Sequence, residues 1–409
     1  MNKIKYFYVN SHVFSSAVYQ TQVIDWLHLY AENGVKFELV HQFFINPKNI
    51  KFHRDQREQI KNAFYGKVRF LYVHHNYPIF RCINKLITFC FFLKDILCNK
   101  KIVIFSRANI AREITFMKKL TGGRIVYYYD LRGATVDEAV QTMKAKGNFS
   151  KREFKKIADI AYGEYLRLTL ADKIFCVSNA LKKYDVEEYH VDESKFVLYP
   201  CLSMHRKFFY DENLRERKRA ELGFTKEDNV YVYSGGVGVA WHVPDAFLRL
   251  FAKIAEKDNH AKMLVLTFKA TKALFDIIES DTKLKNNVQV FEGVPNERIV
   301  DYLNAADFGI LLRENRILNN VASPSKYAEY MLCGLPTIIS ESIHDFANYC
   351  RLHNTGVLFS NDDFEHIEGV VIKPLSKDMF NRKDIADVAA VELSKESAAK
   401  RLVKELIIL

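Results

Sequence analysis

The sequence predicts an α/β protein with two Rossmann-like domains. The chain has 409 residues, more than one hydrophobic core usually organises, so two domains are expected. Short runs of β-forming apolar residues alternate with segments of helical periodicity in both halves of the chain, which is typical of open parallel sheets. Over residues 308–340 the order is strand, polar loop, helix and strand, as in a nucleotide site at a sheet edge.

The charge balance predicts an anionic partner. Lysine and arginine number 60 against 49 aspartates and glutamates, a formal net charge of +11. Nucleic acid, anionic lipid and sugar-nucleotide phosphates all fit such a balance. Because the basic residues are spread and no nucleic-acid-binding module is recognisable, we expect no nucleic acid partner.

The cysteines and the apolar runs indicate a cytoplasmic location. Seven cysteines without a Cys-x-x-Cys pair match neither a disulfide framework nor a zinc site. The N-terminal residues run directly into an expected strand, so no signal peptide is predicted. The longest apolar run, residues 86–93, is far shorter than the roughly 20 residues that cross a bilayer.

The first half of the chain is expected to form a parallel sheet. A helix is expected over 17–32, and residues 42–67 are expected to be irregular. Buried parallel strands form near-continuous apolar runs. Such runs occur at residues 4–9, 37–40, 68–73, 102–105, 124–129, 173–177 and 195–199.

Polar side chains follow three of these strands at their carboxyl ends, where ligands bind in open α/β sheets. They are His12, Ser15 and Ser16 after the first strand, Arg107 after the fourth, and Asp130 and Arg132 after the fifth. Two interpretations stay open: these residues bind a substrate, or they cap helices and lie on the surface.

The segment 78–98 is mostly apolar but carries Arg81, Lys85 and Lys94. One interpretation is an amphipathic basic surface that rests on a membrane. The other is a core helix whose cations extend to solvent. The sequence leaves both open.

In the second half, a glycine-rich turn with Ser234, Gly235, Gly236 and Gly238 follows the strand expected at 230–233. Glycines let backbone N–H groups approach a diphosphate. Strands are also expected at 263–267 and 288–291, with a helix beginning at 268–269. Arg313 follows the strand expected at 308–312.

Residues 323–336, SPSKYAEYMLCGLP, predict a helix with Ser323 as N-cap and Pro324 at the first helical position, ended by Gly334. Lys326 and Glu329 are three residues apart, so they share a face near the positive end of the helix. Lysine suits a phosphate there, and a carboxylate suits a ribose diol. The alternative is an ordinary exposed ion pair.

This stretch resembles the donor site of retaining glycosyltransferases of family 4, which have the GT-B fold, in a branch common in bacterial surface-polysaccharide synthesis. The likeness lies in the Ser-Pro-Ser-Lys opening, the glutamate and the Cys-Gly-x-Pro end. It implies that domain 1–205 binds an acceptor and that domain 206–385 faces it across a cleft and binds a nucleotide sugar. Residues 386–409 would hold a helix that packs back on the first domain.

The resemblance also implies roles for the candidate residues. The catalytic set would be Asp130, Lys326, Glu329 and Arg313. The acceptor-binding set would be His12, Ser15, Ser16, Arg107, Asp130 and Arg132. The donor-binding set would be Ser234, Gly235, Gly236, Gly238, Lys269, Gly293, Arg313, Ser323, Pro324, Ser325, Lys326 and Glu329.

Two departures from the family pattern concern the donor site. Val321 stands where the family commonly has a first glutamate, which contacts the transferred sugar. Trp241 and His242 occupy the region where an Arg and a Lys commonly neutralise the diphosphate. We therefore expect Lys326 to neutralise the diphosphate, with Lys269, Arg313 and Arg316 as further candidates.

The function implied is transfer of a sugar from a UDP- or GDP-linked donor to a glycan or lipid-linked acceptor, with retention, in capsule, O-antigen or lipopolysaccharide synthesis. No cofactor is expected, and no metal, because the chain lacks an Asp-x-Asp pair. An anionic membrane surface at the inner face of the cell membrane is a further expected partner. The alternatives are a sugar-nucleotide 2-epimerase and a catalytically silent nucleotide-sugar-binding protein.

Overall fold

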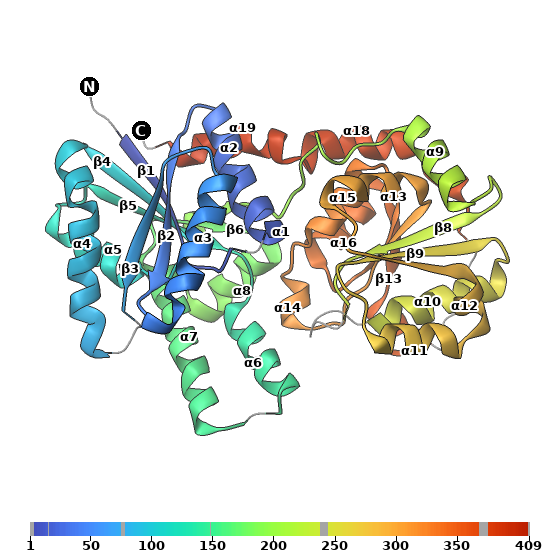
Figure 1. Ribbon diagram of the computed structural model, residues 1–409, viewed down its shortest axis with the longest axis horizontal. Helices are drawn as coiled ribbons and strands as arrows, with labels where there is room; N and C mark the ends of the chain where they lie inside the picture. Colours follow the sequence, from blue (N-terminus) through green and yellow to red (C-terminus); the bar gives the residue numbers. More distant parts are fainter. Residues whose placement is uncertain are drawn as a thin grey trace. The chain divides into compact units, whose positions relative to one another are not determined.

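The computed structural model describes residues 4–14, 16–74, 78–147, 149–237, 244–367 and 375–407. Contacts divide the chain into two compact units (Figure 1). Unit 1 comprises residues 1–143, 147–199 and 399–409, and unit 2 comprises residues 144–146 and 200–398. The expected boundary at residue 205 thus lies inside unit 2, and the last residues of the chain group with unit 1.

Seven parallel strands form the sheet of unit 1, in the order β3-β2-β1-β4-β5-β6-β7. The expected strands all form here. The five inner strands bury most of their residues, whereas the edge strands β3 and β7 are only partly buried. Their bounds are β1 Ile4–Asn10, β2 Phe37–Phe44, β3 Val68–Val73, β4 Lys101–Ser106, β5 Ile125–Leu131, β6 Lys173–Cys176 and β7 Phe196–Leu198. The strand order reverses at β1, which places its carboxyl end at a switch point suited to a ligand.

Helices connect these strands. They are α1 Ser16–Tyr19, the π-helical turn η1 Gln20–Ile24, α2 Asp25–Glu32, α3 Ile50–Ala63, α4 Arg81–Cys98, α5 Ala111–Leu120, α6 Thr135–Ala145, α7 Lys151–Leu170 and α8 Asn179–Tyr189. The final helix α19, Lys395–Leu406, contributes its last residues to unit 1. There Lys173 Nζ donates to Glu405 through the backbone oxygen at 2.9 Å and through Oε2 at 2.7 Å.

The expectation of an irregular segment over residues 42–67 is wrong. Helix α3 fills most of it, and of its side chains only Gln56 and Ile60 are buried. The sequence of this helix is mostly charged and polar, so its few apolar residues give a weak signal for a folded element. The expected helix over 17–32 also differs, because the π-helical turn η1 separates α1 from α2.

Six parallel strands form the sheet of unit 2, in the order β10-β9-β8-β11-β12-β13. Their bounds are β8 Asn229–Ser234, β9 Ala261–Thr267, β10 Val288–Glu292, β11 Phe308–Leu311, β12 Thr337–Ser340 and β13 Gly356–Phe359. The strand order reverses between β8 and β11, so the carboxyl ends of these two strands flank the switch point of this sheet.

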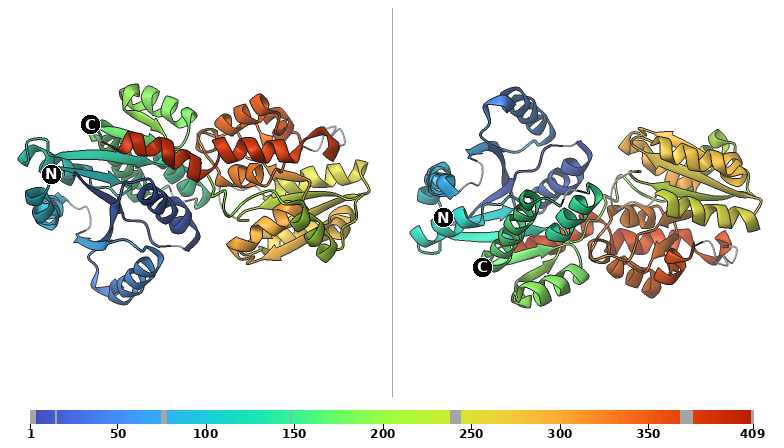
Figure 2. Two further views of the ribbon diagram at one scale, coloured as in Figure 1. Left: turned by 90° about the horizontal axis from the view of Figure 1, so that it is seen from above. Right: turned by 90° about the horizontal axis from the view of Figure 1, so that it is seen from below.

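The sheet of unit 2 lies between two layers of helices, with the gold helices α10–α12 on one side and the orange-red α15 and α16 on the other (Figure 2). The helices are α9 Glu212–Leu222, α10 Pro244–Lys257, α11 Lys272–Ser280, α12 Thr282–Asn287, α13 Ile299–Ala305, α14 Ile317–Asn320, α15 Ser325–Leu332, α16 His344–His353, α17 Asn361–Glu365 and α18 Arg382–Glu392. The helix expected at 268–269 begins instead at Lys272, because Thr271 is its N-cap and its Oγ1 accepts from Leu274 N at 3.2 Å.

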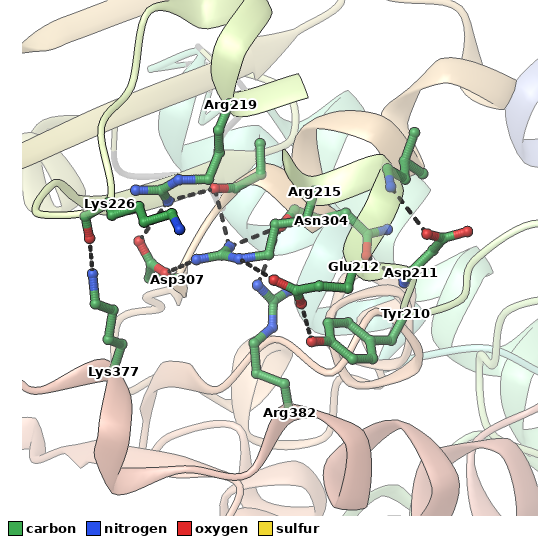
Figure 3. Close-up of polar contacts among 12 residues, drawn as sticks. Tyr210, Asp211, Glu212, Arg215, Arg219, Lys226, Asn304, Asp307, Lys377 and Arg382 are labelled. Atoms are coloured by element: carbon green, nitrogen blue, oxygen red, sulfur yellow. Dashed lines mark hydrogen bonds and ion pairs between the residues drawn. The ribbon is translucent and has the colours of Figure 1, made fainter. Parts of the chain in front are cut away.

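A buried charge cluster holds α9, the end of α13 and the start of α18 together in unit 2 (Figure 3). Asp307 pairs with Arg215 and, at 3.0 Å, with Arg219. Arg215 and Arg382 each donate from Nη1 to the carbonyl oxygen of Ala306 at 2.8 Å. The last carbonyl groups of a helix have no hydrogen-bond donor within the helix, and these two arginines are the donors at the end of α13.

Candidate functional site

The switch point of unit 2 gathers predicted donor-site residues from two strands. Ser234 ends β8, and Arg313 follows β11, its neighbour in the sheet. The turn after β8 is held by Gly235 N, which donates to Leu266 O at 2.9 Å. Gly238 and residues 239–243 lie outside the described residues.

Helix α15 begins at Ser325, one residue later than predicted. Pro324 is its N-cap and supplies no side-chain bond to the first turn. The prediction that Ser323 caps this helix is wrong, because Ser323 Oγ accepts from Cys201 N at 3.0 Å. An uncapped first turn leaves N–H groups that suit an anion.

Lys326 and Glu329 form an ion pair on α15, with Lys326 Nζ 3.0 Å from Glu329 Oε2. Ser325 Oγ lies 3.3 Å from the other carboxylate oxygen. Glu329 is only 6% exposed, so the alternative of an ordinary exposed pair does not describe it. A buried carboxylate next to an accessible ammonium is a polar site that a ligand can rearrange.

Arg313 is buried beside this helix. Its backbone N donates to Ser340 Oγ at 2.9 Å, and its carbonyl oxygen accepts from Ser342 Oγ at 2.8 Å. Burial lowers the pKa of Arg313 below its ordinary value, which the nearby Tyr233 and Tyr330 partly offset. The site therefore holds a second cation in a fixed position.

Two tyrosines that sequence reasoning missed join the parts of this site. Tyr330 of α15 accepts at its hydroxyl from Ser234 N at 2.9 Å, which ties the helix to the end of β8. Tyr233 OH donates to Gly236 O at 2.8 Å. Gly309 makes room for Tyr330, since a Cβ at Gly309 would lie 2.5 Å from the ring. No motif marks the contacts of Tyr330, because they join residues far apart in the sequence.

Lys269 follows β9, and Gly293 follows the edge strand β10. Gly293 N donates to Thr267 O at 2.9 Å with a φ of +63°, a conformation that favours glycine. Lys269 is exposed, and its carbonyl oxygen lies 3.4 Å from Thr267 Oγ1. Within the described ranges, no hydrogen bond or ion pair links either residue to Lys326 or Glu329.

A cavity of about 680 Å³ opens at the carboxyl ends of β1, β4 and β5 in unit 1. It brings together four predicted acceptor-site residues, namely His12, Arg107, Asp130 and Arg132. Ser15 lies outside the described residues, and Ser16 begins α1 without a described side chain. The cavity also includes Glu138 and Arg167, which the prediction omitted.

Asp130 is the buried centre of a charge cluster in this cavity. Tyr8 OH donates to it, Arg107 donates from Nε at 3.0 Å and Nη2 at 2.8 Å, and Arg132 Nε lies 2.6 Å from its other oxygen. Burial raises the pKa of Asp130, but Arg107 and Arg132 outweigh it, so the pKa falls below the ordinary value. The ionised carboxylate therefore orients two guanidinium groups at the cavity floor.

His12 lies at the same strand end. Its Nδ1 is 2.9 Å from Asn10 Oδ1, and its backbone N–H donates to the same oxygen at 3.1 Å. Because an amide oxygen only accepts, Nδ1 carries the proton and Nε2 is left as an acceptor. Burial, aided by Arg107, lowers the pKa of His12, so the ring is neutral near pH 7.

A second buried group adjoins the cavity. Tyr129 OH donates to Glu164 at 2.9 Å, and Arg167 pairs with the same carboxylate. Glu164 and Arg167 are three residues apart on α7, so a charged i,i+3 pair was the available sequence signal. That signal is common on exposed helices, and only the fold shows that this pair is buried.

Two further features are absent from the described residues. That part of the chain contains no group of three His, Cys, Asp or Glu side chains placed to hold a metal ion. None of its helices is both long and apolar enough to cross a membrane.

Comparisons with known proteins agree with this architecture. Residues 215–389 match the family model described as "Glycosyl transferases group 1". A comparison with curated proteins found no match. HepE of Anabaena, solved with UDP, superposes with a TM-score of 0.65 at 11% identity, over 98% of this chain and 99% of its own.

Other solved structures have the same two-domain arrangement of strands and helices. A glycosyltransferase of Rickettsia africae gives a TM-score of 0.64 at 12% identity, over 98% of each chain. WaaG, described as a glycosyltransferase involved in lipopolysaccharide biosynthesis, gives 0.55 at 13% identity, over 98% of this chain and 94% of its own. At such identities the likeness establishes the fold alone. The chain thus has the GT-B fold of two Rossmann-like domains, and its region 215–389 matches the group 1 glycosyl transferases.

Proposed function

We propose that the protein is a retaining glycosyltransferase that moves a sugar from a UDP- or GDP-linked donor to a glycan or lipid-linked acceptor in bacterial polysaccharide synthesis. The observation that carries the proposal is the ion pair on α15 between the buried Glu329 and the partly exposed Lys326, with Arg313 buried at the switch point of unit 2. This pair lies within the region that matches the group 1 family. HepE, which shares the fold, was solved with UDP-glucose.

The donor would bind with its diphosphate at the uncapped first turn of α15. The ammonium of Lys326 would leave Glu329 for the diphosphate, and the freed carboxylate would accept from the ribose hydroxyls. Arg313 supplies a second positive charge. Charge develops on the leaving diphosphate during transfer, so cations fixed at this place stabilise the transition state more than the ground state.

In the transfer step, the bond between the anomeric carbon and the diphosphate oxygen breaks, and the acceptor oxygen bonds to the same face of the sugar. The acceptor proton passes to the leaving phosphate, so no enzyme nucleophile is required. The cavity of unit 1 is the proposed acceptor site. There His12 Nε2 would accept from an acceptor hydroxyl, and Asp130 would keep Arg107 and Arg132 in place.

The test is a transfer assay with a panel of UDP and GDP sugars and glycan acceptors, preceded by thermal shift to find the donor that binds. A ligand of the folded state raises the melting temperature by mass action. Lys326→Met and Glu329→Gln should each reduce transfer at least tenfold while the variants stay folded. The matched control is Lys253→Met, which removes another i,i+3 lysine–glutamate pair of unit 2. Unchanged transfer by both site variants would contradict the proposal.

The same assay separates the alternatives. A 2-epimerase would convert the donor to its epimer without acceptor, which proton NMR of the nucleotide sugar detects. A catalytically silent binding protein would show the thermal shift and no product. The anomeric configuration of the isolated product decides between retention and inversion.

A further inference from the structure

Helix α4 of unit 1 turns its apolar side to solvent. Along it, five residues follow one another at intervals of three and four positions, so they lie on one face. This set, here named the α4 stripe, comprises Ile83, Leu86, Cys90, Leu93 and Leu97. Leu86 and Leu97 are 60% and 72% exposed. Ile79, one turn before Ile83, extends the stripe and is 76% exposed.

The polar side chains of α4 hold the helix in this orientation. Asn84 Oδ1 accepts from His74 N at 2.9 Å, and Asn84 Nδ2 donates to His74 O at 3.0 Å. Near the other end, Asp95 accepts from Arg69 Nη1 at 2.6 Å, and Arg69 Nη2 donates to Phe91 O at 2.5 Å. These two attachments fix the helix about its axis, so the α4 stripe cannot turn inward without breaking them.

Exposed cations border the stripe near the carboxyl end of α4. Lys94 lies at its edge on α4, and Lys100 follows the helix. Helix α5 packs beside α4 (Figure 1). Both helices connect strands of one parallel sheet, so their carboxyl ends lie at the same edge. There α5 adds Lys119 and Leu120, which is 58% exposed.

The acids of this region are already paired. Asp95 binds Arg69, and Asp172 binds Lys118. Arg81 and Lys85 do not belong to the border of the stripe, because both are partly buried. Lys85 Nζ sits 5.8 Å from the ring of Phe116. The surface is therefore an apolar stripe with a positive border.

We propose that the α4 stripe rests on an anionic lipid bilayer, with its leucines in the acyl boundary and Lys94, Lys100 and Lys119 on the headgroups. A helix that lies in the interface combines an apolar face with basic residues at its border, and each lysine adds attraction to anionic lipid. The positive border is complementary to the negative headgroups of such a bilayer, and this complementarity selects the partner. The proposal stands apart from sugar transfer.

The test is co-sedimentation of the full chain with vesicles, without donor or acceptor. Wild type should bind vesicles of phosphatidylglycerol and phosphatidylcholine and bind pure phosphatidylcholine at least tenfold less. The double variant Leu86→Gln/Leu97→Gln should lose at least tenfold in partitioning. The triple variant Lys94→Ala/Lys100→Ala/Lys119→Ala should bind the anionic vesicles more weakly than wild type. The binding that remains should no longer depend on the salt concentration. Because these side chains are exposed, the variants should keep the wild-type melting temperature.

The matched control is Leu352→Gln, a leucine of unit 2 that is 81% exposed. It should bind vesicles as wild type does. The proposal would be overturned if Leu86→Gln/Leu97→Gln bound vesicles as strongly as wild type, or if wild type did not bind them. Neither result would affect the transferase test. A wild-type dimer in sedimentation velocity that Leu86→Gln/Leu97→Gln converts to monomer would also overturn the proposal, since the stripe would then be covered by a second copy.

Discussion

Arg382 closes the carboxyl end of helix α15 at Gly334. Its Nε donates to Gly334 O at 3.0 Å, and its Nη2 donates to Cys333 O at 3.0 Å. Burial lowers the pKa of Arg382 to about 10. The backbones also meet closely here, since a Cβ at Gly334 would lie 2.2 Å from Arg382 O. The helix that carries Lys326 and Glu329 is thereby anchored at its far end to the start of α18.

Gly334→Ala should destabilise unit 2 by more than about 2 kcal/mol. The φ of Gly334 is +61°, which costs a residue with a Cβ about 1–2 kcal/mol, and the contact with Arg382 O adds to that. Urea unfolding followed by tyrosine fluorescence measures the change. Gly223→Ala is the control in the same unit, because Gly223 has a φ of +74° but nothing within 4 Å of its added Cβ. Equal losses in the two variants would show that the Arg382 contact is unimportant.

Glu329→Gln should weaken donor binding more than it weakens folding. The amide keeps the shape of the side chain but loses the charge that Lys326 and, in the proposed complex, the ribose hydroxyls require. Hydrogen bonds to a charged group contribute about 1.5–3 kcal/mol, so the Kd for the donor nucleotide should rise roughly 10- to 100-fold. Isothermal titration with UDP and GDP gives this value. A Kd equal to that of wild type would mean that Glu329 does not contact the nucleotide.

The strands and the polar residues at their ends could be predicted, because buried parallel strands are short apolar runs and their carboxyl ends share one edge. Arg313, Arg107 and Asp130 were predicted in this way. Lys326 and Glu329 were predicted from their spacing on one helix and from the family resemblance. Helix α3 was missed because it buries only Gln56 and Ile60. The cap at Ser323 was misassigned because its partner, Cys201 N, lies 122 residues away in sequence.

The contacts within each site could not be predicted for the same reason. Tyr330 and Ser234 meet across 96 positions of sequence, and Arg107 meets Asp130 across two strands. A sequence pattern reports periodicity along one element, whereas these contacts depend on which strands become neighbours. The exposure of the α4 stripe is a further case, since an apolar helix face predicts burial by default.

Asp130→Asn should destabilise unit 1 by about 3–5 kcal/mol, because it leaves the two buried guanidiniums of Arg107 and Arg132 without their carboxylate. Since the pKa of Asp130 is lowered in the folded state, its contribution is present above its ordinary pKa of about 3.9 and is lost as pH falls through the folded value. Urea unfolding at pH 7 measures the effect.

The control for Asp130 is Glu193→Gln, which breaks the exposed Lys182–Glu193 pair of unit 1. Exposed pairs contribute at most about 1 kcal/mol, so this variant should unfold close to wild type. If Asp130→Asn were as mild as its control, the carboxylate would not be organising the arginines of the cavity.

Asp185 makes the free energy of unfolding of unit 1 depend on pH near neutrality. The side chain is 2% exposed, and its Oδ2 has no hydrogen-bond partner among the described residues. Burial, together with the nearby Glu164, raises the pKa of Asp185 to about 8. In the unfolded chain the ordinary value of about 3.9 applies. Between these two values the folded state holds a proton that the unfolded state has lost, so the free energy of unfolding falls as pH rises through this window.

Asp185→Asn mimics the protonated acid and should remove this loss. From pH 6 to pH 8.5, the free energy of unfolding of wild type should fall by about 2.5 kcal/mol more than that of the variant, since each unit of pH below the folded pKa corresponds to about 1.4 kcal/mol. Urea unfolding of both proteins at the two pH values supplies the difference, in which titrations common to both cancel. Parallel pH profiles would show that Asp185 is already ionised at pH 6 in the folded protein.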